Sequence, residues 1–321
     1  MDADSKILVT GASGLIGTHL VNTLLNLKFQ VTGIIHNRPH YFDQNENLKL
    51  IKGDLTDNNF CQKICQGIDY IFHLAVETGS IVKNAKHPAS IMTPTILMDF
   101  NMLKAAHEEN VKGYLYCSCA CVYPAELENM TEENAWVGPP PEMHKTISWS
   151  KRIAELQCQS FYKEFGDKIS IVRPSNTYGP YDVFDIENSH VISAFIKKVL
   201  SKTDPFIIWG TGEQIREFVY AEDIAKGMIL AINSQSNAEP INLGGGEAIK
   251  IKDLAKKIML ISKHEPEIKY DKTKPSGHMK RVLNSKKAKK ELGFLPSTSL
   301  DEGLQKTIKW YQKKQNDLDA N

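Results

Sequence analysis

The feature that most constrains the fold of this 321-residue chain is a glycine-rich turn close to its first residue. A strand-like run at residues 7–10 leads into Gly11, Gly14 and Gly17 at G-x-x-G-x-x-G spacing, and an apolar, helix-like segment follows at 15–27. Glycines let the backbone approach a pyrophosphate at a helix N-terminus, where free N–H groups and the helix dipole favour negative charge. This strand–turn–helix context predicts a dinucleotide-binding loop, with an ordinary glycine-rich turn as the alternative.

Apolar runs rich in β-forming residues alternate with helix-like segments through the first half of the chain. Amphipathic segments such as 15–27 and 91–109 separate them. The predicted strands are residues 7–10, 29–35, 48–52, 70–74, 114–118 and 169–172. Strands that alternate with helices are typical of a parallel sheet covered on both faces. We therefore predict an α/β fold built on a doubly wound parallel (Rossmann) sheet.

Beyond about residue 174 the strict alternation stops and a mixed pattern follows. Its clearest predicted elements are a helix at 187–201, a strand at 206–209, and helices at 221–233 and 299–314. We expect residues 1–174 to form the dinucleotide-binding domain, with a returning segment near 214–240. We expect residues 175–321 to form a smaller C-terminal α/β lobe that binds the substrate.

Charge and targeting signals exclude several classes of function. The chain has 39 basic and 38 acidic residues, so no global field attracts nucleic acid or an anionic membrane. No window reaches the roughly 18 consecutive apolar residues of a membrane-spanning helix, and the N-terminus lacks a signal-peptide pattern.

The cysteines at 61, 65, 117, 119, 121 and 158 lack zinc or disulfide-framework spacing. We interpret all six as thiols in the cytoplasm and expect no metal.

The end of the second predicted strand bears on which dinucleotide binds. Residues 34–38 offer no Asp or Glu to hold a ribose 2′-hydroxyl, whereas Arg38, with His36, suits a 2′-phosphate. This favours NADP over NAD, against the alternative that Arg38 is a solvated surface residue. Asp54 is placed to reach the adenine or, alternatively, to cap a helix. The full predicted cofactor-binding set is Gly11, Ser13, Gly14, Leu15, Ile16, Gly17, His36, Arg38, Asp54, Leu55, Leu74, Ala75 and Lys151.

Several motifs further along the chain occur together in one enzyme family. They are C-V-Y-P at 121–124, R-P-S-N-T-Y-G-P at 173–180, N-S-H-V-I at 188–192, W-G-T-G at 209–212, R-E-F at 216–218 and K-P-S-G at 274–277. In this order they resemble the extended short-chain dehydrogenase/reductases of the NAD-dependent epimerase/dehydratase family that act on nucleotide sugars. Within that family the similarity is greatest to the GDP-L-fucose synthases, and the GDP-mannose 3,5-epimerases are a second similar group. The resemblance runs from residue 6 to about 312.

The resemblance implies a catalytic set from which two redox groups are missing. The family's redox Ser or Thr and its Tyr-x-x-x-Lys pair fall on Cys119, Ile147 and Lys151. An isoleucine cannot donate or accept a proton, and a thiol is a weak donor. Cys121 and His190 match the family's epimerisation pair, which serves the two faces of a carbon next to a ketone. For Cys121, the alternative is a small buried residue at a strand end.

The missing tyrosine would normally bind the sugar's carbonyl oxygen. Candidate replacements are Ser118, Tyr123, His144 or a water. The resemblance assigns the substrate's diphosphate and base to Asn176, Lys198, Trp209, Arg216 and Arg281. For the lysines the alternative is a solvated basic face, and for Trp209 it is a core position.

The implied activity is epimerisation at C3 or C5 of an NDP-linked 4-keto-(6-deoxy)hexose, with GDP as the expected nucleotide. Reduction at C4 lacks its tyrosine. Two alternatives remain open: an NDP-sugar 4-epimerase or dehydratase, and an NAD(P)-binding pseudoenzyme or regulatory subunit. The resemblance also implies a homodimer formed through helices near 91–109 and 148–165.

Overall fold

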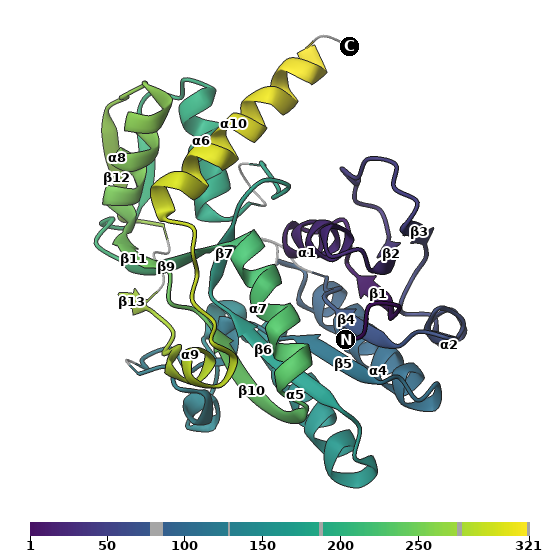
Figure 1. Ribbon diagram of the computed structural model, residues 1–321. Helices are drawn as coiled ribbons and strands as arrows, with labels where there is room; N and C mark the ends of the chain where they lie inside the picture. The colour runs from purple at the N-terminus through teal and green to yellow at the C-terminus, as the bar shows by residue number, and fades with distance from the viewer. Residues whose placement is uncertain (78–85, 128, 186–188, 275–277, 320–321) are drawn as a thin grey trace.

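The computed structural model describes residues 1–77, 86–127, 129–185, 189–274 and 278–319. Figure 1 shows a larger lobe built on a twisted sheet, and a second lobe that carries α6, α8 and α10. Among the described residues, no helix is long and apolar enough to cross a membrane.

The larger lobe contains a seven-stranded sheet in the order β10-β6-β5-β4-β1-β2-β3, and every neighbouring pair is parallel. Its strands are β1 (Lys6–Thr10), β2 (Gln30–Ile35), β3 (Leu48–Lys52), β4 (Tyr70–His73), β5 (Gly113–Cys117), β6 (Ile169–Pro174) and β10 (Asn237–Leu243). The six strands expected in the first half are present with bounds within two residues of the prediction. The predicted doubly wound parallel sheet is confirmed.

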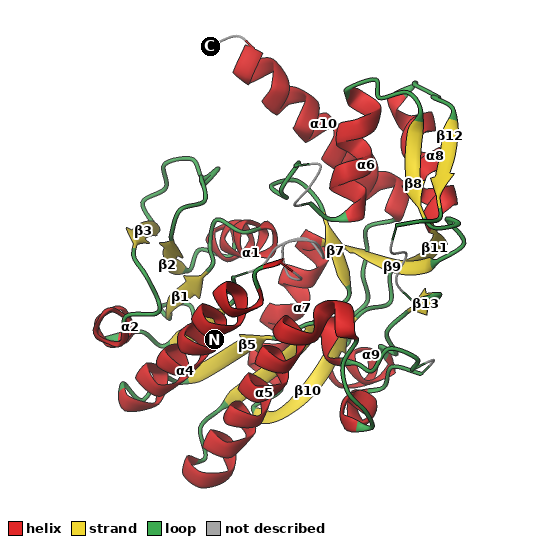
Figure 2. Cartoon of the chain, turned by 180° about the vertical axis from the view of Figure 1, so that it is seen from behind, coloured by secondary structure: helices red, strands yellow, loops and turns green. Residues whose placement is uncertain are grey.

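Helices cover both faces of this sheet. One face carries α1 (Leu15–Asn26) and α7 (Ala221–Ser234), and the other carries α2 (Asn58–Cys65), α4 (Pro88–Glu108) and α5 (Lys145–Phe165). Figure 2 shows α4 and α5 in front of the sheet. Successive side chains of a strand point to opposite faces, so Ile7 and Val9 pack with α1 and α7 while Leu8 packs with α2 and α4.

The second lobe has its own core and two small sheets. In one sheet β9 (Ile215–Tyr220) pairs with β7 (Asn176–Tyr178), β11 (Glu247–Lys250) and β13 (Lys280–Arg281); in the other, β8 (Phe206–Trp209) pairs with β12 (Ile268–Asp271). Its helices are α6 (Val191–Leu200), α8 (Ile251–Ser262) and α10 (Leu300–Asp319), whereas α9 (Lys286–Leu292) packs against α7 and β10 of the larger lobe. The helix expected at 187–201 begins at Val191, and residues 186–188 lie outside the described residues.

The chain passes between the lobes more than once. After β9 in the second lobe, α7 returns to the larger lobe and β10 becomes the edge strand beside β6. The carboxyl ends of the parallel strands and the short 3-10 helices η1 (Ala120–Val122), η2 (Glu132–Trp136) and η3 (Glu142–His144) carry most of the predicted site residues.

Candidate active site

The glycine loop has the close packing that a dinucleotide-binding turn requires. Gly11 has φ +64°, and a Cβ there would lie 3.0 Å from backbone atoms of Leu74 and Ala75. A Cβ on Gly17 would lie 2.1 Å from the Gly11 carbonyl oxygen. Gly14 precedes α1 without a side-chain cap, so no side chain caps the helix's first N–H groups. These residues fit a dinucleotide, whose pyrophosphate would accept from this helix N-terminus.

A buried polar network lies under this loop, and the sequence prediction missed it. The Thr10 hydroxyl accepts from the N–H groups of residues 74 and 75 at 3.0 and 3.1 Å. The same hydroxyl lies 2.8 Å from His73 Nδ1, while His73 Nε2 lies 3.0 Å from Asp99 and Tyr116 donates to Asp99 at 2.8 Å. The sequence signal for this network is weak: Thr10, His73 and Asp99 are each a polar residue within a mostly apolar strand or helix.

Arg38 follows the carboxyl end of β2 and contacts the second lobe. Its guanidinium donates to the backbone oxygen of Tyr181, and burial lowers the pKa of Arg38. The side chain is therefore partly buried rather than a solvated surface group, and its contact with a 2′-phosphate stays a prediction. One carboxylate oxygen of Asp54 accepts from both the N–H and the hydroxyl of Thr56, each at 2.9 Å. Asp54 thus shapes the turn before α2, and its reach to the adenine also stays a prediction.

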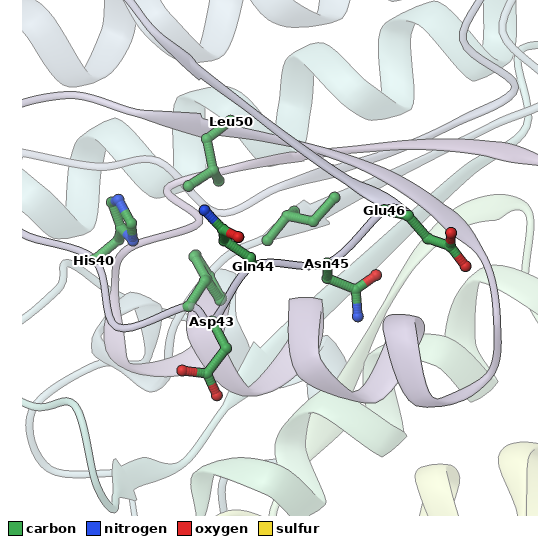
Figure 3. Close-up of a pocket in the computed structure, with 8 residues that line it drawn as sticks. His40, Asp43, Gln44, Asn45, Glu46 and Leu50 are labelled. Atoms are coloured by element: carbon green, nitrogen blue, oxygen red, sulfur yellow. The ribbon is translucent and has the colours of Figure 1, made fainter.

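The loop between β2 and β3, together with β3, lines an open pocket of about 550 Å³ (Figure 3). Its lining residues are His40, Phe42, Asp43, Gln44, Asn45, Glu46, Leu48 and Leu50. None of the predicted site residues lines it, and the carboxylates of Asp43 and Glu46 disfavour a phosphate. The same loop is held to α10, because Lys314 Nζ donates to the Tyr41 hydroxyl at 2.6 Å.

The ammonium group of Lys151 lies at the carboxyl end of β5. Its ammonium group donates to the Cys117 carbonyl at 3.0 Å and lies 4.6 Å from the centre of the Tyr116 ring. The side chain projects from α5, one helical turn after Ile147, and both residues are buried. Its contact with the nicotinamide ribose stays a prediction.

The interpretation of all six cysteines as thiols is wrong at two positions, because Cys119 and Cys121 form a disulfide. In an extended strand these Cα atoms would be almost 7 Å apart, but the chain turns into η1 after β5 and brings them to 5.3 Å. The cysteines at 61, 65, 117 and 158 are free thiols. A disulfide neither takes up nor releases a proton, so a catalytic role for Cys119 or Cys121 requires its reduction.

His190 has a carboxylate partner that the sequence did not identify. His190 immediately precedes α6, and its Nδ1 lies 3.3 Å from Oδ2 of the buried Asp182, which also accepts from Ser193 at 2.5 Å. The Asp182 charge raises the pKa of His190, whose side chain is 69% exposed. Within the described part of the chain, no hydrogen bond or ion pair joins His190 to Cys121. A single Asp eight residues before a His has no characteristic spacing, which is why it was missed.

Two of the candidate replacements for the missing tyrosine already form hydrogen bonds with other buried side chains. Ser118 Oγ donates to Glu155 at 2.5 Å, and the Tyr123 hydroxyl donates to Asn242 at 2.7 Å while accepting from Arg173. All these side chains are buried. Of the three side chains considered, His144 is the one that forms no such buried network with the residues that the structure describes.

Two buried arginines hold the segment that contains the disulfide. Arg173 forms a bidentate pair with Glu155, with N···O distances of 2.9 and 2.6 Å, and donates to the Glu132 backbone at 2.8 Å. Arg152 donates to the backbone oxygens of Val122 and Gly138 at 2.8 and 2.7 Å. This bracing holds the backbone at Val122, Glu132 and Gly138 near the carboxyl ends of β5 and β6.

The two predicted diphosphate arginines lie next to each other. β13 runs parallel to β9 with Arg281 and Arg216 in register, so both side chains leave the same face of the sheet. Arg281 Nη2 donates to the backbone oxygen of Ala120 at 2.5 Å, within the Cys119–Cys121 turn. Burial, followed by the charge of Arg216, lowers the pKa of Arg281 to about 10.

The other predicted substrate residues are spread over the second lobe. Asn176 donates to the Glu217 backbone at 2.8 Å, and Lys198 donates to the Ile207 backbone at 3.1 Å. Trp209, at the end of β8, is 41% exposed, which excludes the core interpretation. Asn188 and residues 275–277 of the quoted motifs lie outside the described residues.

Proteins similar to this chain in sequence and in fold are known. The chain is 29% identical over 316 residues to the probable GDP-L-fucose synthase 1 of Oryza sativa subsp. japonica, covering 97% of this chain and 93% of that protein. It is 28% identical over 317 residues to GDP-mannose 3,5-epimerase 1 of the same plant, covering 96% and 82%. Among solved structures, UDP-glucose 4-epimerase of Thermotoga maritima with UDP-glucose superposes with a TM-score of 0.84 at 26% identity, covering 97% and 99%.

The family model described as NAD dependent epimerase/dehydratase family matches residues 7–244, which include the glycine loop, the disulfide turn, Lys151 and β9. That match spans most of the chain. The chain therefore belongs to the NAD dependent epimerase/dehydratase family, as an NAD(P)-dependent enzyme.

Proposed function

We propose that this enzyme epimerises a nucleotide-linked 4-keto-hexose at C3 or C5, with a GDP-linked sugar as the expected substrate. The observation that carries the proposal is the in-register pair Arg216 and Arg281, bonded through Arg281 to Ala120 of the Cys119–Cys121 turn. Paired guanidiniums suit a diphosphate, and this position would hold it beside the proposed proton-transfer group. Two of the named relatives, the probable GDP-L-fucose synthase and the GDP-mannose 3,5-epimerase, are named for GDP-linked sugars, which supports the same nucleotide here.

In the proposed reaction, Cys121 and His190 act on opposite faces of the carbon next to the ketone. One group removes the C–H proton to give an enolate, and the other delivers a proton to the opposite face. Asp182 supports this role by bonding His190 Nδ1, which fixes the ring orientation and favours its charged form. The Cys121 thiol is required, and a reducing cytoplasm, which we propose as the location, would supply it by opening the disulfide.

The proposed reaction does not include reduction at C4. The family's proton donor to the carbonyl is Ile147 here, and positioned general acids typically contribute about 10² to 10⁴ in rate. NAD(P) supplies hydride chemistry when bound, but a hydride added to the carbonyl carbon needs a proton for its oxygen. We propose NADP as the preferred form, supported by Arg38 and by the lack of an acidic residue at 34–38.

Solvent deuterium incorporation tests the proposed function. The reduced protein is incubated in D₂O with a GDP-4-keto-6-deoxyhexose, and mass spectrometry follows deuterium entering the sugar. Cys121→Ser and His190→Asn should each suppress incorporation, while Cys117→Ser, a nearby free thiol, should retain it. Equal incorporation in all three variants would contradict the proposed roles, and none in the reduced wild type would contradict the reaction.

We also propose a homodimer formed through α4 and α5, which lie side by side in Figure 2. These helices expose large apolar side chains: Leu97 and Phe100 on α4, and Leu156, Tyr162 and Phe165 on α5. Exposed apolar groups on adjacent helices are typical of an association surface. Light scattering at micromolar concentration should show a dimer, and Phe100→Glu should shift it to a monomer; a wild-type monomer would contradict this proposal.

A further inference from the structure

Four basic side chains from three separate segments converge beside the disulfide turn. They are Arg216 of β9, Arg281 of β13, His278 just before β13, and His144 at the end of η3. Arg216 Nη1 donates to the His278 backbone oxygen at 2.7 Å, and Arg281 is in register with Arg216. The charges of both arginines and of His278 lower the pKa of His144. We call these four residues the cationic cluster.

The cationic cluster holds like charges together in a partly buried place. Registered neighbours on adjacent strands are about 4.8 Å apart, and like charges facing each other across strands are destabilising. Burial, then Arg281, His278 and Arg216, lower the pKa of His144 to about 4. Burial and both arginines also lower the pKa of His278, against the opposing charge of the exposed Glu126. Burial and the neighbouring positive charges therefore disfavour the protonated form of both imidazoles.

His278 also has an unpaired ring nitrogen. Its Nε2 is shielded from solvent and has no hydrogen-bond partner among the residues that the structure describes. Buried polar atoms are normally hydrogen-bonded, because leaving one unpaired costs its full desolvation free energy. A phosphate oxygen brought within reach of this nitrogen would accept from it and satisfy it.

We propose that His144 and His278 bind the diphosphate of a nucleotide sugar together with Arg216 and Arg281, and that they take up protons as it binds. The inference rests on the proposed function, which supplies the nucleotide sugar. The diphosphate replaces repulsion between like charges by attraction to a dianion, which favours each protonated imidazole. A ligand that raises a group's proton affinity binds more tightly as pH falls. Binding should therefore strengthen from pH 8 to pH 6.

Titration calorimetry on the full-length protein tests this with GDP-mannose and UDP-glucose as probes. A nucleotide sugar is preferable to a free nucleoside diphosphate, whose terminal phosphate itself titrates near pH 6. We expect the Kd of the better probe to fall about three- to tenfold between pH 8 and pH 6, since one proton linked to binding gives at most tenfold per pH unit. Repeating the titration in buffers of different ionisation enthalpy should show net proton uptake.

Variants separate ligation from a structural role. His278→Asn and His144→Asn should each reduce the pH dependence of the Kd. His278→Arg carries a charge at every pH tested, so this variant should bind tightly at pH 8 and its Kd should change less with pH than that of the wild type. His264→Asn, a partly buried histidine after α8, is the matched control and should keep the wild-type response.

Two outcomes oppose the inference, and they are distinguishable. Binding that is independent of pH and without proton uptake in the wild type would overturn the inference alone, whether or not the variants fold. No binding of either probe at any pH would overturn the proposed function and the inference with it.

Discussion

Replacing Glu155 by Ala should leave the guanidinium of Arg173 buried without its counter-ion. Both side chains are completely shielded from solvent, and two N–H groups of Arg173 reach the carboxylate at 2.9 and 2.6 Å. At 2.6 Å and an effective dielectric constant of 20, the Coulomb attraction is about 6 kcal/mol. The folded protein loses this attraction and keeps the desolvated cation, while the unfolded chain hydrates both.

The net loss expected from breaking such a buried pair is about 3–5 kcal/mol in the free energy of unfolding. With an unfolding entropy of about 2.1 cal/mol/K per residue, a chain of 321 residues should melt about 4–7 °C lower. Replacing both partners, as Glu155→Ala with Arg173→Met, leaves neither charge of this pair buried without the other. The double variant should therefore melt higher than the Glu155→Ala single variant.

Differential scanning calorimetry measures these melting temperatures directly. Glu164→Ala, on the exposed end of the same helix, is the matched control and should change the free energy of unfolding by less than about 0.5 kcal/mol. If Glu155→Ala melted within 1 °C of the wild type, or if the effects of the two substitutions simply added, the Arg173–Glu155 ion pair would not contribute the expected free energy of unfolding.

Three further outcomes follow from the site. Asp182→Asn should lower the pKa of His190, as followed by NMR, because it removes the carboxylate charge that raises this pKa; an unchanged pKa would contradict the ion pair. Gly17→Ala should abolish NADPH binding in a fluorescence titration, since its Cβ would lie 2.1 Å from a backbone oxygen, whereas Gly138→Ala, with 3.8 Å to its nearest neighbour, should bind normally. Ile147→Tyr should increase hydride transfer from NADPH to the 4-keto sugar, measured by absorbance, and no increase would show that the tyrosine is not the sole missing group.

Much of the larger lobe could be predicted because its signals are local. Each early strand is a short run of β-forming residues bounded by polar turns, and each helix has an apolar face, so neighbours in sequence decide both. The turn at Gly11 was predictable for the same reason: the strand before it and the helix after it lie within a few residues.

The candidate site was harder to predict because its contacts join distant segments. β13 has two residues and no hydrophobic period, so nothing local indicates that Arg281 aligns with Arg216 some 65 positions earlier. The contact of Arg38 with Tyr181 depends on how the two lobes pack. The disulfide was missed because the cysteine spacing matches no disulfide framework, and the pairing depends on the turn that the chain makes after Cys119.

The return of β10 to the sheet has a consequence for the order in which the protein is synthesised. β6 ends at Pro174, but its outer neighbour begins only at Asn237, after β7, β8 and β9 of the other lobe have been translated. Until then the nascent sheet has an open edge at β6, and unpaired strand edges promote association between chains. At about 5–20 residues per second, the ribosome leaves that edge uncovered for several seconds, so aggregation during synthesis should depend more on β6 than on any strand completed earlier.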